Sequence, residues 1–352
     1  MNKRWICGDV WMDIFPSFNR AQLGLKMALL SDRFDFLVDA HFDEKTELTI
    51  WRRIRIFKDE LTGPKPIVYV VSKNLFPLPE HPLPNKIRFK DLNIEYIDHF
   101  VLEFLRSNKQ IWDRIGTKLE LSIEYCDQSI WDVLAREIWP IFAPNIRHFT
   151  FKDGDHLDNL LRLGSPTILT DCDQLTSIDS GALFPDGIAD HFDGPNAISA
   201  GQALVKWLHT PTKNGQPKQL HRTNYVGPPN LEWVNNFKET FLRATTSVSY
   251  TIQLYFYATT MPIEQFELVN KRTNEKLTLK LSEELGYNWV YNWLLQRCPI
   301  GESATAPVKW KNRENSDANL NSVRFDLGGK HCIGPLSPPA EEEEEADQSN
   351  EK

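Results

Sequence analysis

The sequence predicts a mixed α/β protein, with α+β and α/β classes both open, that starts with helices and ends in antiparallel strands. Apolar residues recur at three- and four-residue spacing over the first forty residues, which is typical of amphipathic helices. From about residue 85, segments of alternating apolar and polar residues take turns with helix-like segments. The last patterned segments before residue 300 are joined by a short polar turn, as in a hairpin.

These patterns divide the chain into four parts. We expect a helical module at residues 1–45 and a β-hairpin with a proline-rich connector at 46–84. An α/β domain follows at 85–300, and residues 301–352 form a polar and acidic tail that we expect to be largely disordered. At 352 residues with 41% hydrophobic side chains, the chain is long enough to bury a substantial core.

The formal net charge of −8 is concentrated at one end of the chain. Residues 340–352 contain seven acidic side chains and one lysine, so they carry −6 of this charge. An unbroken acidic run repels itself and stays solvated. The remaining body is close to neutral, which gives no electrostatic basis for nucleic-acid binding.

Cysteine usage and hydropathy indicate the compartment. The five cysteines are odd in number and far apart, which fits neither a disulfide framework nor a zinc site. No apolar stretch is long enough to span a bilayer, and the first residues do not resemble a signal peptide. We therefore expect an intracellular protein, cytoplasmic or nuclear, that has no membrane partner.

The N-terminal module is expected to consist of three short helices. Residues 8–15 have one apolar face, which Pro16 interrupts because proline cannot continue the hydrogen-bond ladder. Asn19 and Ser31 are candidate N-caps for a second and a third helix. Three short helices cannot bury all their apolar groups among themselves. Either a partner protein covers the remainder, or the helices form a cap on the following domain.

The body alternates between predicted strands and helices. Strands are expected at residues 48–57, 67–71, 87–96, 118–125, 145–151, 175–178, 219–226, 248–256, 266–269, 276–281 and 287–295. Helices are expected at residues 100–105, 130–138, 157–163 and 231–244. The proline-rich stretch 76–84 is interpreted as a stiff connector.

Strands that start near residues 87, 119, 146 and 175 recur at roughly thirty-residue spacing. Strand–helix units of this length predict an irregular leucine-rich-repeat-like array. Because the repeat consensus is absent, an ordinary parallel α/β layer is the alternative.

No motif indicates catalysis, a cofactor or a metal site. Residues 153–158 hint at a calcium loop but lack its closing glutamate, so a capping loop before a helix fits better. Residues 190–194 fit a surface turn. Cys172 lies between two aspartates, which raise the pKa of a thiol and make it a poor nucleophile. We therefore expect a protein that is not an enzyme.

Residues 6–18, followed by Leu23, by residues 28–34 and by Leu37 and Val38, resemble an F-box. Other segments resemble an F-box-like protein family of plant-parasitic nematodes, and they lie at residues 25–33, 38–42, 82–86, 266–268, 277–279 and 293–300. The sequence departs from the usual F-box in having Ile6-Cys7 in place of Leu-Pro and Phe34 where tryptophan is common.

This resemblance implies a function. F-box helices dock on a Skp-type linker, and through it on a cullin, in SCF-type ubiquitin ligases, while the rest of the chain recruits a protein target. The chain would then be a non-catalytic adaptor that has no cofactor. The alternative is an interaction module that recruits no ligase. The resemblance implies that the residues that contact the linker are Ile6, Val10, Ile14, Phe15, Leu23, Leu30, Phe34 and Leu37.

Overall fold

The structure is a computed structural model of the whole chain. It describes residues 6–18, 23–43, 49–51, 54–58, 66–70, 74–83, 87–124, 128–152, 154–181, 183, 185, 199–221, 231–257, 264–285, 290–301, 320–328 and 332–337.

The elements alternate along the chain as the sequence predicts. The strands are β1 (Thr49–Trp51), β2 (Ile54–Phe57), β3 (Ile67–Val70), β4 (Asn74–Pro77), β5 (Ile87–Phe89), β6 (Leu92–Ile94), β7 (Thr117–Ile123), β8 (Ile146–Phe151), β9 (Ser177–Asp179), β10 (Lys218–His221), β11 (Tyr250–Tyr257), β12 (Phe266–Asn270), β13 (Glu275–Leu285), β14 (Val290–Pro299) and β15 (Asn321–Leu327). The helices of the body are α4 (His99–Ser107), α5 (Lys109–Ile115), α6 (Gln128–Val133), η4 (Leu134–Ile138), α7 (Trp139–Phe142), η5 (Ala143–Asn145), α8 (Gly154–Leu163), α9 (Ala200–His209) and α10 (Leu231–Arg243).

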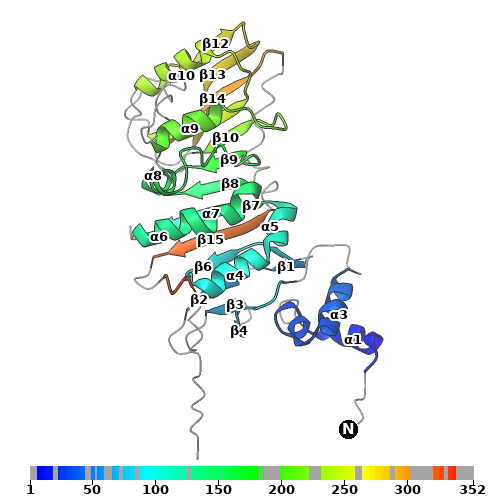
Figure 1. Cartoon of the computed structure of the whole chain (residues 1–352). Helices are drawn as coiled ribbons and strands as arrows, with labels where there is room; N and C mark the ends of the chain where they lie inside the picture. The colour runs from blue at the N-terminus through cyan, green and yellow to red at the C-terminus, as the bar shows by residue number, and fades with distance from the viewer. Residues whose placement is uncertain are drawn as a thin grey trace, which may run out of the picture.

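Most strands join one mixed sheet of thirteen strands, in the order β12-β13-β14-β11-β10-β9-β8-β7-β15-β6-β2-β3-β4 (Figure 1). The strands from β2 to β11 in this order all run parallel. Antiparallel strands extend the sheet at both ends, which confirms the expected antiparallel region before residue 300. The predicted mixed α/β class is therefore correct.

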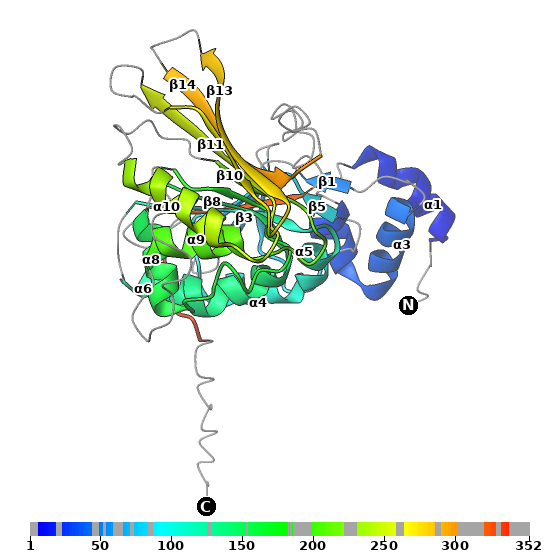
Figure 2. The ribbon, with the colours of Figure 1, turned by 90° about the horizontal axis from the view of Figure 1, so that it is seen from above.

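The helices that connect the parallel strands lie together on one face of the sheet (Figure 2). Strands β6, β7, β8, β9, β10 and β11 follow each other in chain order, with helices between successive strands. Apolar side chains alternate along each strand toward the helices, as Leu119 and Leu121 do in β7. They form one continuous core with the inner faces of the helices, which include Trp112, Trp131 and Trp207.

The C-terminal part differs from the prediction of a largely disordered tail. Residues 321–327 form β15, which lies between β6 and β7 and pairs in parallel with both. Val323, Phe325 and Leu327 are fully buried. The sequence shows this strand only as one short alternating run within polar surroundings, and its partner in β7 lies 204 positions earlier. Local sequence patterns therefore could not predict the position of β15 in the sheet.

The proline-rich connector also differs from expectation. Its first two residues, Phe76 and Pro77, are the last residues of β4, which pairs with β3. Leu78 and Leu83 belong to the main core, and the Leu83 N–H donates to Asn108 Oδ1 at 2.7 Å. Prolines restrict this segment to an extended conformation, and its leucines then anchor it on α4 and α5. The stretch packs on the domain and does not act as a spacer.

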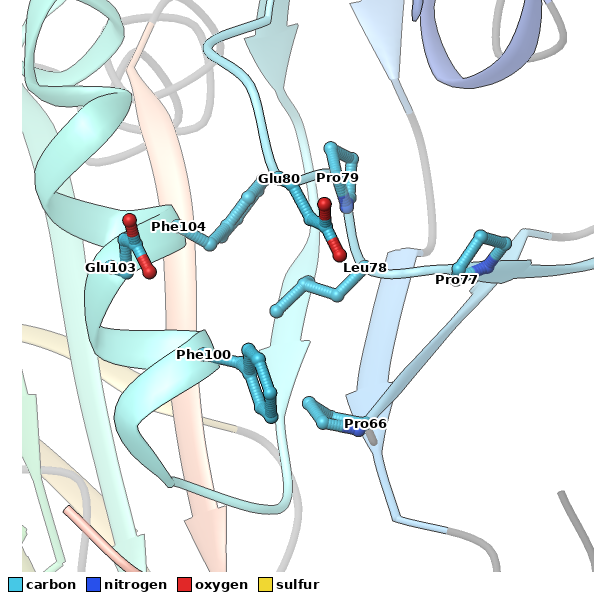
Figure 3. A pocket seen from close by; sticks show the side chains of 8 residues that line it. All are labelled: Pro66, Pro77, Leu78, Pro79, Glu80, Phe100, Glu103 and Phe104. Atoms are coloured by element: carbon cyan, nitrogen blue, oxygen red, sulfur yellow. The ribbon is translucent and has the colours of Figure 1, made fainter. Parts of the chain in front are cut away.

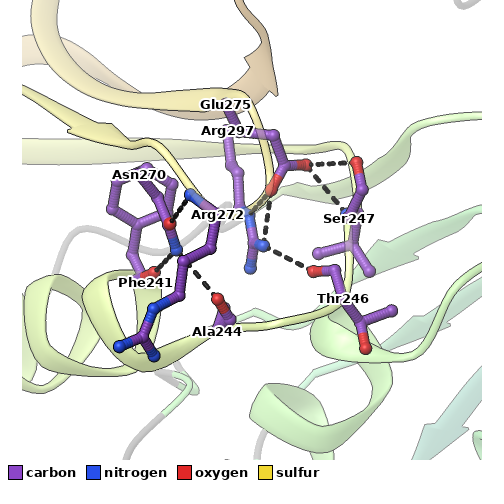
Figure 4. A network of polar contacts seen from close by, with 9 residues as sticks. Phe241, Ala244, Thr246, Ser247, Asn270, Arg272, Glu275 and Arg297 are labelled. Atoms are coloured by element: carbon purple, nitrogen blue, oxygen red, sulfur yellow. Dashed lines mark hydrogen bonds and ion pairs between the residues drawn. The ribbon is translucent and has the colours of Figure 1, made fainter.

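The antiparallel end is stabilised by a buried polar network (Figure 4). Asn274 has a positive φ of 56°, which suits a tight turn and which asparagine tolerates, and it lies between β12 and β13. Glu275 follows directly and pairs with Arg297 of β14 at 2.6 Å. The loop between α10 and β11 is held by the same pair, because Arg297 donates to the Thr246 carbonyl at 2.8 Å.

Candidate docking surfaces

The N-terminal segment forms a separate helical unit beside the sheet edge that carries β4 (Figure 1). It consists of α1 (Gly8–Ile14), η1 (Phe15–Ser17), η2 (Leu23–Met27), η3 (Ala28–Leu30) and α3 (Asp32–Asp43). Helix α1 ends before Pro16, as predicted, and Ser31 lies directly before α3, with its Oγ 3.4 Å from the Phe34 N–H. The expected cap Asn19 lies outside the described residues.

The unit has a small core of its own. Phe15, Leu23, Ala28 and Val38 are buried together and form a cluster distinct from the core of the body. The Phe15 ring also packs edge-on against buried His41, with 5.6 Å between ring centroids. Phe15 and Leu23 were expected to contact a linker, but in this conformation they lie inside the unit and hold its helices together.

The other six expected docking residues reach the surface. Ile6, Val10 and Leu30 are 47%, 47% and 63% exposed. Ile14, Phe34 and Leu37 are partly buried. Residues 10 and 14 are four positions apart in α1 and therefore lie along one side of this helix, whereas Ile6 precedes the helix.

Helices α1 and α3 contact each other closely. Trp11 and Phe34 are in edge-to-face contact with 4.9 Å between centroids. The Arg33 guanidinium donates to the Ile6 carbonyl. Gly8 lies against Leu37, because a Cβ at Gly8 would be 3.2 Å from Leu37 Cδ2. The two helices thus pack partly buried apolar side chains against each other at their crossing.

Phe36 is a surface residue that the sequence analysis missed. It is 71% exposed on α3. It lies outside the helix face that carries Phe34, Leu37 and Val38. This position in the helical pattern is the sequence signal that would have predicted its exposure. A large apolar residue off the core-facing side of an amphipathic helix is solvated unless a partner covers it.

The helical unit touches the body through polar and charged groups. Lys26 Nζ lies 5.0 Å from the centroid of the Phe76 ring in β4. The pKa of Asp35 is raised by burial and by the neighbouring Asp32 carboxylate, while the nearby His81 side chain lowers it. Through these contacts the unit lies against the β4 edge, while its apolar cluster stays separate from the core of the body.

The face of the sheet opposite the helices is polar. One register row crosses six parallel strands and carries Arg324, Glu120, Thr150, Asp179, His221 and Gln253. At one end of this row, Arg324 Nη2 lies 3.1 Å from Glu120 Oε2.

At the centre of the row, Asp179 lies between two histidines. His148 Nε2 is 3.0 Å from Asp179 Oδ2, and His221 Nδ1 is 3.1 Å from Asp179 Oδ1. The His221 ring also packs edge-on against Tyr255, with 5.6 Å between centroids. These groups are positioned by backbone pairing of β8 to β11, and His148 is itself buried, so they form a fixed polar and aromatic cluster on this side of the sheet.

The residues considered for chemistry do not form a reactive centre in the described part of the chain. Burial, followed by Asp171 and Asp173, raises the pKa of Cys172 to about 12, so the expected direction is confirmed and burial is the larger cause. Residues 154–158 form the first turns of α8, so the helix begins earlier than expected and the predicted capping loop is wrong for these residues. Residues 190–194 lie outside the described residues. No group of three or more His, Cys, Asp or Glu residues among those described is arranged to hold a metal ion.

No helix in the described ranges is long and apolar enough to cross a membrane. Comparison with known proteins finds no match to this chain among protein families, curated proteins or solved structures.

Proposed function

We propose that this chain is a non-catalytic substrate-recognition adaptor of the F-box type. Its N-terminal helices dock on a Skp-type linker of a cullin–RING ubiquitin ligase, and its sheet binds a protein target. The observation that carries the proposal is the exposure of three large apolar side chains, Ile6, Val10 and Leu30, on this small helical unit. Such exposed apolar side chains are candidates for protein binding.

The arrangement of the body supports the second half of the proposal. Parallel strands that follow each other in chain order, with helices on one face, are the architecture of a leucine-rich-repeat-like array. The opposite face carries none of the described connecting helices and has polar side chains such as Arg324 and Glu120 at its surface. An adaptor of this kind does no bond chemistry, because it acts by raising the local concentration of the target near the transferring enzyme.

The alternative is an interaction module whose helices only cap the β4 edge. Lys26 over the Phe76 ring favours it, and so does the proximity of His81 to Asp35. The two functions differ in what Val10 and Leu30 do. In a cap these residues stay exposed and have no role, whereas in an adaptor they are buried on linker binding.

Co-purification with a Skp-type linker tests the proposal. We expect a complex whose affinity falls about thirtyfold or more, on the order of 2 kcal/mol, when Val10 and Leu30 are both changed to Asp, because charges would then be buried in the interface. Leu242→Asp is the matched control, since Leu242 is 50% exposed on α10 and lies in the body. Equal binding by the double variant and the wild type would favour the cap, provided that circular dichroism shows both to be folded.

A further inference from the structure

A small pocket lies between the proline-rich segment and α4 (Figure 3). Its cavity volume is about 110 Å³. Prolines, Leu78, Phe100 and Phe104 form the walls, and Glu80 and Glu103 are the charged residues that line it. No part of the proposed linker-docking surface belongs to this pocket.

The local sequence explains why the pocket is preformed. Helix α4 begins at His99 because the Asp98 side chain caps it by accepting a hydrogen bond from the Val101 N–H at 3.0 Å. Phe100, Glu103 and Phe104 are then three or four positions apart and share one side of α4. The facing wall consists mainly of prolines, whose fixed backbone angle makes it rigid. A rigid wall lowers the entropic cost of binding.

The side chains are arranged as an apolar cleft beside two carboxylates. Figure 3 shows the side chains of Leu78 and Phe100 directed toward each other, with Pro66 beside the Phe100 ring. Glu103 comes from α4 and Glu80 from the proline-rich segment, so each wall contributes one carboxylate. Both glutamates are exposed to solvent, and their charges therefore act at the rim.

This combination fits an alkyl chain that ends in a cation. An apolar cavity of about 150 Å³ accepts a molecule as large as benzene, so the space here suits the slimmer stem of a lysine or arginine. Such side chains bury their methylene groups against apolar surface while the charged end stays near water. Two carboxylates attract that charge, and the Phe100 ring adds a favourable cation–π contact. An anionic group would be repelled.

We infer that this pocket binds a lysine or arginine side chain of the recruited target protein. That the side chain comes from a recruited target rests on the proposed adaptor function, whereas the preference of the pocket for a basic side chain does not. Strand β4, which ends in Pro77 at the pocket, is the last strand of the sheet order. A target can place its basic side chain in the pocket without pairing with β4, because the helical unit lies against that edge.

Binding of three blocked pentapeptides to the full-length protein tests the inference. The peptides have glycines around a central lysine, arginine or norleucine, and binding is followed by the NMR signals of the Leu78 methyl groups, assigned with a Leu78→Ile variant. We expect the lysine and arginine peptides to shift these signals in a saturable way. Norleucine, which has the alkyl stem and no charge, should bind on the order of tenfold more weakly.

Variants of the two carboxylates sharpen the result. Glu103→Gln and Glu80→Gln should each weaken binding of the lysine peptide several-fold and leave the norleucine peptide unchanged, and added salt should reduce the difference. Glu267→Gln is the control, because Glu267 is an exposed glutamate on β12, far along the sheet order from β4. Equal binding of lysine and norleucine peptides, or no shift at Leu78, overturns the inference.

The same variants separate this inference from the adaptor function. Glu103→Gln should co-purify with the Skp-type linker as the wild type does, because Glu103 lies in α4 and outside the helical unit. Linker binding without peptide binding rejects the pocket and keeps the adaptor. Peptide binding without linker binding rejects the adaptor and keeps a pocket for basic side chains.

Discussion

At the scale of single residues, the most consequential interaction is the buried ion pair of Glu275 and Arg297. Their side chains are 0% and 1% exposed, and every interaction drawn in Figure 4 around them connects different elements. The second carboxylate oxygen of Glu275 accepts hydrogen bonds from Ser247 Oγ at 2.9 Å and the Val248 N–H at 2.8 Å. A buried charge is tolerated only when it is paired and fully hydrogen-bonded.

Removing one member of this pair should therefore destabilise the protein strongly. We expect Glu275→Ala to lower the free energy of unfolding by about 3–5 kcal/mol, because the Arg297 charge remains buried and loses its partner. Urea denaturation followed by tryptophan fluorescence measures the change. The double variant Glu275→Leu with Arg297→Met should recover much of the loss, and a single variant as stable as the wild type would show that the pair is dispensable.

Lys218 gives a pH-dependent effect at the same scale. Its ammonium group is buried and donates to the carbonyls of Trp207 and Thr210 at the end of α9. Desolvation lowers its pKa from 10.5 to about 7. Between these values the unfolded chain binds a proton that the folded protein does not, so stability should rise as the pH increases from about 7 to 10.5.

Comparison with Lys218→Met isolates this contribution. The stability of the wild type relative to the variant should increase with pH by at most about 1.4 kcal/mol per pH unit, the limit for one proton. Below pH 7 the difference should level off, since Lys218 is then charged in both states. Urea midpoints at several pH values measure it, and a pH-independent difference would contradict the assignment.

At the scale of elements, β15 shows the limits of sequence patterns. The strands and helices from residue 54 to 299 were largely predicted, because each has its own alternation or helical spacing. Helix α9 was missed even though it has a capping box of Ser199 and Gln202, since no strong pattern precedes it. The position of β15 in the sheet was unpredictable, because pairing over 204 positions leaves no local signal.

Two substitutions in β15 test its structural role. Phe325 is fully buried in the main core, so Phe325→Ala should cost about 3–5 kcal/mol of stability. Arg324 is adjacent and half-exposed on the opposite face, where it pairs with Glu120. Arg324→Ala should cost about 1 kcal/mol or less, because exposed ion pairs contribute little. Thermal unfolding compares the two, and similar losses would mean that the strand does not separate a core face from a solvent face.

At the scale of the whole molecule, the described residues form two apolar clusters of very different size. The large cluster runs through the sheet and its helices, whereas the N-terminal cluster has four buried apolar residues, Phe15, Leu23, Ala28 and Val38. The sequence predicted that short helices could not bury all their apolar groups. The sequence could not predict which of these apolar side chains would be exposed. Phe15 and Val10 belong to the same helical pattern, and only the packing of the helices buries the one and leaves the other exposed.

So small a core should open more easily than the sheet. We expect hydrogen exchange of the full-length protein to be faster in residues 32–43 than in β7 and β8, since local stability follows the amount of buried apolar surface. Phe15→Ala should speed exchange in the N-terminal helices and leave β7 and β8 unchanged. The same variant should weaken linker binding indirectly, because the unfolded unit must be ordered before it docks. Equal protection of α3 and β7, with both lost together in the variant, would show that the helices and the sheet unfold as one unit and would favour a structural cap.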